Sequence, residues 1–128
     1  METLIIDPTD YTPEIIFNPS GNIFSIKGKS LPENSVDFYK PIFEWISNFS
    51  NNNPNKNIAL DVDIEYMNSS SIKLLFYIFN TIDKHFKTNN NPETCINWFC
   101  PKGDELIAQK GKESKDILEL PFHIKFKD

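Results

Sequence analysis

Residues 58–73, with the sequence IALDVDIEYMNSSSIK, decide the fold of this chain. In the first nine of them, large apolar side chains alternate with Ala or acidic residues, a period of two that predicts a β-strand with one buried face. The apolar members of the alternation are Ile58, Leu60, Val62, Ile64 and Tyr66. From Ile72 to Phe86, apolar residues recur every three or four positions, which predicts an amphipathic helix. The segment therefore predicts a strand that leads directly into a helix.

Three adjacent hydroxyls, those of Ser69, Ser70 and Ser71, lie at the predicted junction between this strand and this helix. Asn68 or Ser69 is the expected N-cap, because such side chains accept hydrogen bonds from the first amides of a helix. The other amides at a helix N-terminus have no partner within the helix and attract anions. The junction therefore suits a phosphate group, with Lys73 one turn further on. The alternative is that these residues act only as a structural helix cap.

The rest of the chain supplies further strands and helices. A second main helix is expected after Asn34, with Asn34 as its cap, Asp37 as the capping-box partner, and Pro41 bending or dividing it. The other patterns predict strands at residues 12–17, 23–27, 95–100 and 122–127, and a short helix at residues 102–111. The sequence thus predicts one α/β domain over residues 1–128. Its mixed β-sheet has about five strands and is covered mainly on one face by two main helices and one shorter helix.

The composition excludes several classes of function. The chain has 13 basic and 18 acidic side chains and a formal net charge of -5, which argues against nucleic acid as a partner because non-specific binding depends on Lys and Arg. The first residues lack the features of a secretory signal, and no apolar run approaches the roughly 20 residues that span a bilayer. Cys95 and Cys100 point to opposite faces of one predicted strand, which excludes a disulfide between them. We therefore expect a cytoplasmic protein that does not enter the membrane.

Catalytic chemistry has little support in the sequence. A serine hydrolase would need a base beside Ser69, but His85 follows 16 residues later in the same predicted helix, about 24 Å away at about 1.5 Å per residue. No Gly-x-Ser-x-Gly motif is present, and the four glycines do not form a phosphate-binding loop. We expect His85 and His123 at the surface, and we predict a non-enzymatic protein with no catalytic residue and no cofactor.

Acidic residues line the polar face of the strand predicted before Asn68. Asp61, Asp63 and Glu65 follow one another at two-residue steps, and their oxygen atoms could bind a hard cation. The simpler interpretation is a sheet face in contact with water, and we predict no metal site.

Three segments of the chain share their order and spacing with one known family. They are residues 12–15 (TPEI), residues 28–34 (GKSLPEN) running on to FYKP at residues 38–41 and to Trp45, and residues 66–73 (YMNSSSIK). Through these segments most of the chain resembles the SiaC family of bacterial regulatory phosphoproteins, whose fold is similar to the STAS domain of anti-sigma factor antagonists. Each segment alone is a weak signal, but together they make the resemblance specific.

The resemblance implies control by reversible phosphorylation. In this family the first hydroxyl after the Asn is the phosphoacceptor, which corresponds to Ser69 here, although Thr is usual at that position. Asn68, Ser70, Ser71 and Lys73 are then the neighbours of the phosphorylation site. The implied partners are a serine/threonine protein kinase, a metal-dependent phosphatase, and a diguanylate cyclase or similar effector, which the unphosphorylated protein binds and activates.

Three further residues in the family-like segments are candidates for the partner surface, namely Glu14, Glu33 and Asn34. Glu33 and Asn34 have a competing explanation, because both residue types are common where a helix starts. The alternative function is a STAS-like module that binds a protein or a small ligand and is not controlled by phosphorylation.

Overall fold

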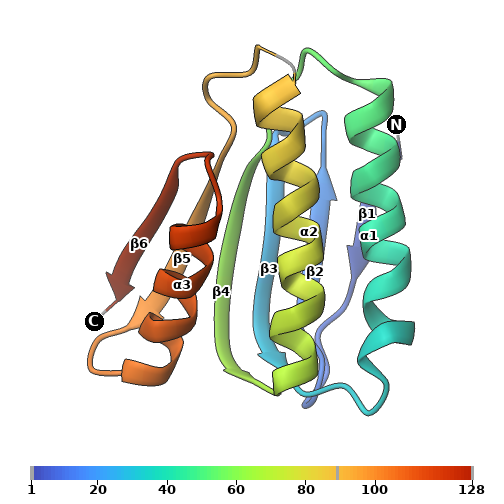
Figure 1. Ribbon diagram of the computed structural model, residues 1–128. Coiled ribbons are helices and arrows are strands. Elements are labelled where there is room, and N and C mark those ends of the chain that lie inside the picture. Colours follow the sequence, from blue (N-terminus) through green and yellow to red (C-terminus); the bar gives the residue numbers. More distant parts are fainter. Residues whose placement is uncertain (1, 89, 128) are drawn as a thin grey trace.

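One mixed β-sheet organises the computed structural model, which describes residues 2–88 and 90–127. The six strands of the described residues lie in the sheet in the same order as in the sequence (Figure 1). They are β1 (Leu4–Ile6), β2 (Glu14–Asn18), β3 (Ile23–Ser30), β4 (Ala59–Met67), β5 (Cys95–Pro101) and β6 (Phe122–Lys127). The helices are α1 (Ser35–Asn52), α2 (Ser69–Thr88) and α3 (Glu105–Ile117). The predicted α/β class is confirmed, and the additional strand is β1, which is too short to show a period in the sequence.

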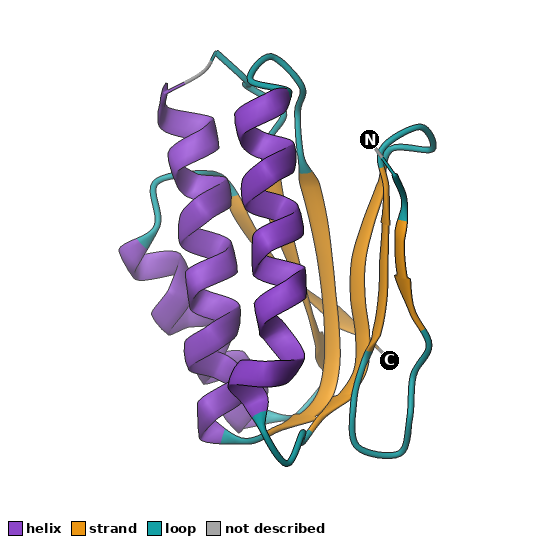
Figure 2. Cartoon of the chain, turned by 90° about the vertical axis from the view of Figure 1, so that its right-hand side faces the viewer, coloured by secondary structure: helices purple, strands orange, loops and turns teal. Residues whose placement is uncertain are grey.

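The connections between strands determine which face of the sheet the helices cover. β1, β2 and β3 pair antiparallel, whereas β3, β4, β5 and β6 pair parallel. Each parallel pair is joined through one helix, and every connection moves to the next strand in the same direction. Because such crossovers are right-handed, all three helices lie on one face of the sheet, as Figure 2 shows. The opposite face, called the open face below, carries no helix.

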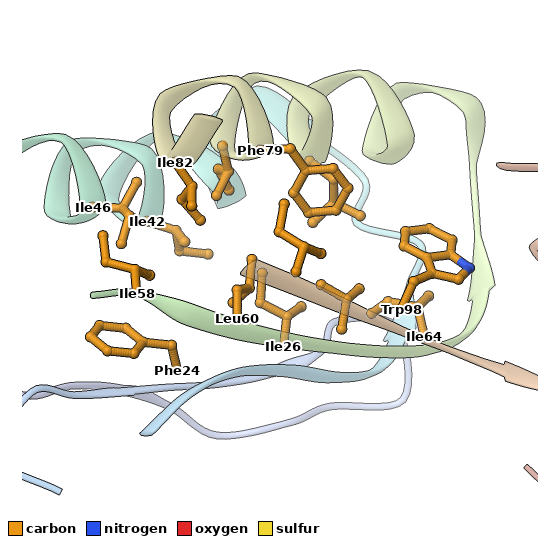
Figure 3. Packing of buried hydrophobic residues seen from close by; sticks show 14 of the residues in the cluster. Phe24, Ile26, Ile42, Ile46, Ile58, Leu60, Ile64, Phe79, Ile82 and Trp98 are labelled. Carbon is orange, nitrogen blue, oxygen red and sulfur yellow. The ribbon is translucent and has the colours of Figure 1, made fainter. Parts of the chain in front are cut away.

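The hydrophobic core lies between the sheet and the helices and follows the alternation read in the sequence. Leu60 and Ile64 of β4 are buried and point toward the helices, and Ile42 and Ile46 of α1 meet them from the other side (Figure 3). Burying a side chain of this size stabilises the fold by roughly 1.5–3 kcal/mol. β4 is therefore firmly held, and so is the start of α2 that follows it.

Tyr66 departs from the predicted alternation, because its side chain is 61% exposed. The pairing of β3 with β4 shifts by one residue at this point: Gly28 pairs with Ile64 and Lys29 with Tyr66, so Glu65 is an extra residue in β4. One extra residue turns the side chains that follow it to the opposite face. The Lys29 ammonium lies 5.9 Å from the centroid of the Tyr66 ring. The prediction of a buried Tyr66 is therefore wrong.

Of the two effects expected of Pro41, bending or dividing its helix, division does not occur, because α1 is one helix from Ser35 to Asn52. α3 differs from its predicted extent and continues past Gly111 to Ile117. A Cβ atom at Gly111 would lie 2.7 Å from two atoms of the Trp98 ring. Gly111 therefore allows α3 to approach β5 closely and does not end the helix. Across the described residues, every helix falls short of the length and apolar character that crossing a bilayer requires.

The two histidines lie in different environments. His123 is exposed as predicted, but His85 is buried, so the prediction of a surface position is wrong for His85. Its Nε2 is 2.6 Å from the carbonyl oxygen of Lys56, and its Nδ1 is 2.7 Å from the hydroxyl of Ser50. A carbonyl oxygen can only accept, so Nε2 donates to Lys56, and Nδ1 shares a hydrogen bond with the Ser50 hydroxyl. His85 thus connects the C-terminal end of α2 with the C-terminal part of α1 and the loop after it.

Candidate functional site

The N-termini of α1 and α2 meet at one edge of the sheet. β3 and β4 are parallel, so the helices that follow them begin at the same edge. The hydroxyl oxygens of Ser35, in the first turn of α1, and Ser70, in the first turn of α2, are 2.6 Å apart and share a hydrogen bond. Two helix N-termini, each with a partial positive charge, therefore lie side by side.

Asn68 is the N-cap of α2 and also connects the helix with the end of β3. Its Oδ1 accepts from the backbone amide of Ser71 at 2.9 Å and from the Ser70 hydroxyl at 3.2 Å. Its backbone amide donates to the carbonyl oxygen of Ser30 at 3.1 Å, and its Nδ2 donates to that of Pro32 at 3.4 Å. The sequence left Asn68 and Ser69 as alternative caps, and the hydrogen bonds select Asn68. The Ser69 side chain is consequently not required for capping.

A buried cluster of three hydroxyls lies directly beneath this junction. The Ser30 hydroxyl is 2.5 Å from the Tyr39 hydroxyl and 2.8 Å from that of Ser71, and the Ser71 hydroxyl also donates to the Ser30 carbonyl oxygen at 3.0 Å. All three residues are at most 1% exposed. Burial raises the pKa of Tyr39 to about 12, although its hydrogen bonds with Ser30 and Ser71 act in the opposite direction. The cluster joins β3, α1 and α2 and fixes the first turn of α2.

The three serines of the junction therefore have three different environments. Ser71 is buried in the cluster, and Ser70 is exposed but bonded to Ser35 and Asn68. Ser69 is exposed, and its hydroxyl makes no hydrogen bond with any other residue that the structure describes. Of the three serines, only Ser69 offers a freely accessible hydroxyl. Ser71 could have been assigned to the core from the sequence, because it lies four residues before Leu75 and so belongs to the buried stripe of α2.

The surroundings of Ser69 suit a phosphoryl group. The backbone amides of Ser69 and Ser70, at the first two positions of α2, have no acceptor within the helix. Lys73 is exposed one turn further along α2. A phosphate on Ser69 would gain hydrogen-bond donors and a favourable helix dipole without displacing any buried group.

The other predicted site residues divide into two groups. Asn34 is the N-cap of α1 and accepts from the backbone amide of Asp37 at 3.1 Å, and Glu33 is exposed beside it. Both lie at the edge of the sheet where α1 starts, and hence on the side of the molecule that carries Ser69. Glu14 lies elsewhere, in a pocket that Lys27 and Asp63 also line. The structure thus does not bring Glu14 together with Ser69.

Two of the three acidic residues of β4 bind side chains of neighbouring strands, whereas Glu65 is exposed. Asp61 accepts from Asn97 Nδ2 at 2.9 Å, and Asp63 forms a 2.5 Å ion pair with Lys127. Within residues 2–88 and 90–127, no group of three or more His, Cys, Asp or Glu side chains is arranged to hold a metal ion.

Sequence reasoning missed the partners of the junction, namely Ser30, Ser35 and Tyr39. Each lies within or next to a family-like segment. Ser30 and Ser35 bond to serines of the junction that are tens of residues away in the chain, and Tyr39 joins the cluster through Ser30. No local pattern reveals such a contact. Only the parallel pairing of β3 with β4 brings the two segments together.

Comparison with known proteins identifies the class to which this fold and site belong. A family model described as "SiaC family regulatory phosphoprotein" matches residues 6–127. The chain therefore belongs to the SiaC family of regulatory phosphoproteins. A regulatory protein of this kind acts through its partners, in agreement with the prediction of a non-enzymatic protein.

Solved structures and one curated relative are similar over nearly the whole chain. SiaC of Pseudomonas aeruginosa has the same fold, with a TM-score of 0.87 and 24% identity, and the match covers 99% of this chain and 100% of that chain. The crystal structure of the diguanylate cyclase SiaD in complex with its activator SiaC, from the same species, matches with a TM-score of 0.88 and 25% identity over 97% of this chain and 99% of that chain. An uncharacterised protein of P. aeruginosa strain UCBPP-PA14 is 26% identical over 128 residues, which are 100% of this chain and 99% of the relative.

Proposed function

We propose that this protein switches a diguanylate cyclase on and off through the phosphorylation state of Ser69. The unphosphorylated protein binds and activates the cyclase. A serine/threonine kinase adds the phosphoryl group and a metal-dependent phosphatase removes it. The observation that supports this proposal most directly is the exposed Ser69 hydroxyl, which is free of hydrogen bonds with the other described residues and lies at a capped helix N-terminus in a SiaC family protein.

The physical basis is a change in surface charge without a change in fold. Phosphorylation adds about -1.5 to -2 charges, which the first turn of α2 tolerates. A partner docked over Ser69 would have to desolvate this group, and the penalty is several kcal/mol unless the partner supplies Arg or Lys. Phosphorylation is therefore expected to weaken binding by one or more orders of magnitude.

The first test is the site of phosphorylation. The purified chain is incubated with ATP and a lysate of its own source cells, and its intact mass is measured. The parent and Ser70→Ala should each gain about 80 Da per phosphoryl group, whereas Ser69→Ala should gain nothing. Ser70→Ala is the matched control, because Ser70 is the exposed hydroxyl next in the chain. Phosphorylation of Ser69→Ala to the same extent as the parent would refute the assignment.

The second test is binding. Ser69→Ala and Ser69→Asp are immobilised in equal amounts, and the diguanylate cyclases retained from the same lysate are quantified by mass spectrometry. Ser69→Ala should retain at least about tenfold more cyclase than Ser69→Asp, a difference of about 1.4 kcal/mol or more. Equal retention would contradict control through this residue and would favour a binding module that phosphorylation does not regulate.

A further inference from the structure

The outer surface of the helical layer exposes large apolar side chains. Val36 of α1, Tyr77 of α2 and Ile117 of α3 are 61%, 47% and 67% exposed. Figure 1 shows α2 between α1 and α3, so these residues come from three neighbouring helices. Apolar side chains that are exposed together on neighbouring elements are typical of a binding surface.

Two grooves run along α2 and share Tyr77 as the ridge between them. The first lies between α1 and α2, has a volume of about 170 Å³, and is lined by Val36, Phe43, Leu74 and Tyr77, among others. The second lies between α2 and α3, has a volume of about 310 Å³, and is lined by Phe76, Tyr77 and Ile117, among others. We call these two grooves and the Tyr77 ridge the double groove.

The charge of the double groove is opposite to that of the protein as a whole. Lys40 lines the first groove, and Lys73 and Lys110 line the second. Among the described residues that line it, Glu113 is the single acidic residue, and its carboxylate lies 3.7 Å from the Lys110 ammonium. The surface is therefore apolar with a basic rim, on a protein whose formal net charge is -5. A surface of this kind is complementary to an apolar partner with acidic flanks.

The double groove is continuous with Ser69. Ser69, Lys73 and Tyr77 follow one another along α2 at four-residue steps, and residues at this spacing lie on the same side of a helix. At about 1.5 Å per residue, Tyr77 is about 12 Å from Ser69 along the helix axis, and Lys73 is halfway between them. The hydrogen bond between Ser35 and Ser70 also brings Val36 to this end of α2. A phosphate on Ser69 would thus lie at one end of the groove, roughly within the 8–10 Å over which charges interact in physiological salt.

We propose that the double groove binds an acidic amphipathic helix of the partner protein. The apolar face of that helix packs on both sides of Tyr77, as in other helix-in-groove complexes, and its acidic side chains pair with Lys40, Lys73 and Lys110. This inference rests on the proposed function and adds to it the site and the chemistry of the partner. Phosphorylation of Ser69 then weakens binding in two ways, because the phosphate repels the acidic helix and competes for Lys73.

The test uses two synthetic peptides and the full chain. Each peptide is a helix of roughly 20 residues with Leu on one face; the other face carries Glu in the first peptide and Lys in the second. Affinity is measured by fluorescence anisotropy and the binding site by backbone amide NMR shifts. The Glu peptide should bind at least about tenfold more tightly than the Lys peptide, lose affinity as salt is raised, and shift the signals of Val36, Tyr77 and Ile117. Equal affinity of the two peptides, or shifts confined to the open face of the sheet, would overturn the proposal.

Variants locate the interaction on the surface. Tyr77→Ala should weaken binding of the Glu peptide by about tenfold or more, because Tyr77 supplies contacts in both grooves. The double variant Lys40→Glu with Lys73→Glu should reverse the preference between the two peptides. Lys125→Glu is the matched control, since Lys125 is exposed on β6, away from both grooves, and it should change neither affinity. Unchanged peptide binding in the Tyr77→Ala and double variants, with their circular dichroism spectra intact, would exclude this surface.

The same variants separate this inference from the proposed function. If Ser69→Asp no longer binds the cyclase while Tyr77→Ala and the double variant still bind it, regulation through Ser69 is supported and the double groove is not the binding site. If the groove variants no longer bind the cyclase while Ser69→Asp still binds it, the double groove is supported as the binding site and regulation through Ser69 is refuted. A second copy of the chain is the competing occupant. Sedimentation showing a dimer that Tyr77→Ala dissociates would assign the surface to self-association and refute the proposal.

Discussion

The two ends of α2 differ in what they expose. At the N-terminal end, Ser69 presents an unbonded hydroxyl to solvent, on a turn held from below by Asn68 and Ser71. At the C-terminal end, Asp83 and His85 are buried and hydrogen-bonded to backbone groups of other segments. The buried polar side chains at the C-terminal end stabilise the fold. At the N-terminal end, the Ser69 side chain makes no such contact with the other described residues.

This difference shows how a modifiable residue can be placed on a rigid frame. Asn68 provides the cap and Ser71 provides the buried hydrogen bonds, so the conformation of the first turn does not depend on Ser69. A charge can then be added at Ser69 without loss of any structural contact made by its side chain. The comparison predicts that stability will be sensitive to changes at the C-terminal end and in the buried cluster, and insensitive to changes at Ser69.

The largest expected loss of stability follows from Asp83→Ala. The Asp83 carboxylate accepts from the backbone amides of Glu119 and Leu120 at 3.0 and 2.8 Å, and the side chain is almost fully buried. Its removal leaves two amides without a partner, and we expect the free energy of unfolding in urea to fall by about 3 kcal/mol. Asp116→Ala, at an exposed position of α3, is the control and should stay within about 0.5 kcal/mol of the parent. Similar small effects of both changes would remove the distinction between the two ends of α2.

The next effect is a loss of stability at high pH that depends on Tyr39. The pKa of Tyr39 is raised from 10.0 to about 12 in the fold, so the folded state retains the proton while the unfolded chain releases it. The stabilising contribution is fully present below about pH 10 and is lost as pH rises through about 12, and the total loss amounts to about 2–3 kcal/mol. The difference in unfolding free energy between the parent and Tyr39→Phe, measured across this range, should show the change. A constant difference would mean that the cluster beneath Ser69 is open to water.

A smaller effect distinguishes two serines within one helical turn. Ser71→Ala removes the hydrogen bonds with the Ser30 hydroxyl and carbonyl oxygen, and it should lower the unfolding free energy by about 1–2 kcal/mol. Ser69→Ala is the matched control and should change it by less than about 0.5 kcal/mol. Equal losses in the two variants would show that Ser69 has a structural role after all.

The smallest expected effect is that of Ser69→Asp on stability. A negative charge in the first turn of a helix is favourable by roughly 0.3–1 kcal/mol when exposed, and salt reduces the benefit. We therefore expect the midpoint of thermal unfolding to stay the same or rise slightly, and the small rise to vanish at high salt. A clear fall in the midpoint would imply that charge at this position disrupts the fold and acts through unfolding.

The alternation in residues 58–64 and the helical period after Ile72 predicted β4 and α2, since burial of one face imposes these periods directly on a sequence. Chain order and periodicity also predicted the mixed sheet with its helices on one face. Local chemistry predicted a helix cap at Asn68 or Ser69, because a cap and the first helical turn are set by adjacent residues, and the resemblance to the SiaC family pointed to Ser69 as the phosphorylation site. These features depend on contacts between residues that are close in the sequence, or on the burial of one face of a strand or helix.

Tertiary structure alone decided the features that depend on distant partners. The extra residue in β4 turned Tyr66 outward because the pairing of β4 with β3 shifts there. The contacts of Ser30 with Ser71 and of Ser35 with Ser70 became visible only when the two strands were placed side by side. His85 is buried because segments far along the chain supply its hydrogen bonds. A sequence records which side chains can be buried or exposed, but hydrogen-bond partners separated by tens of residues are chosen by the register of the strands that carry them.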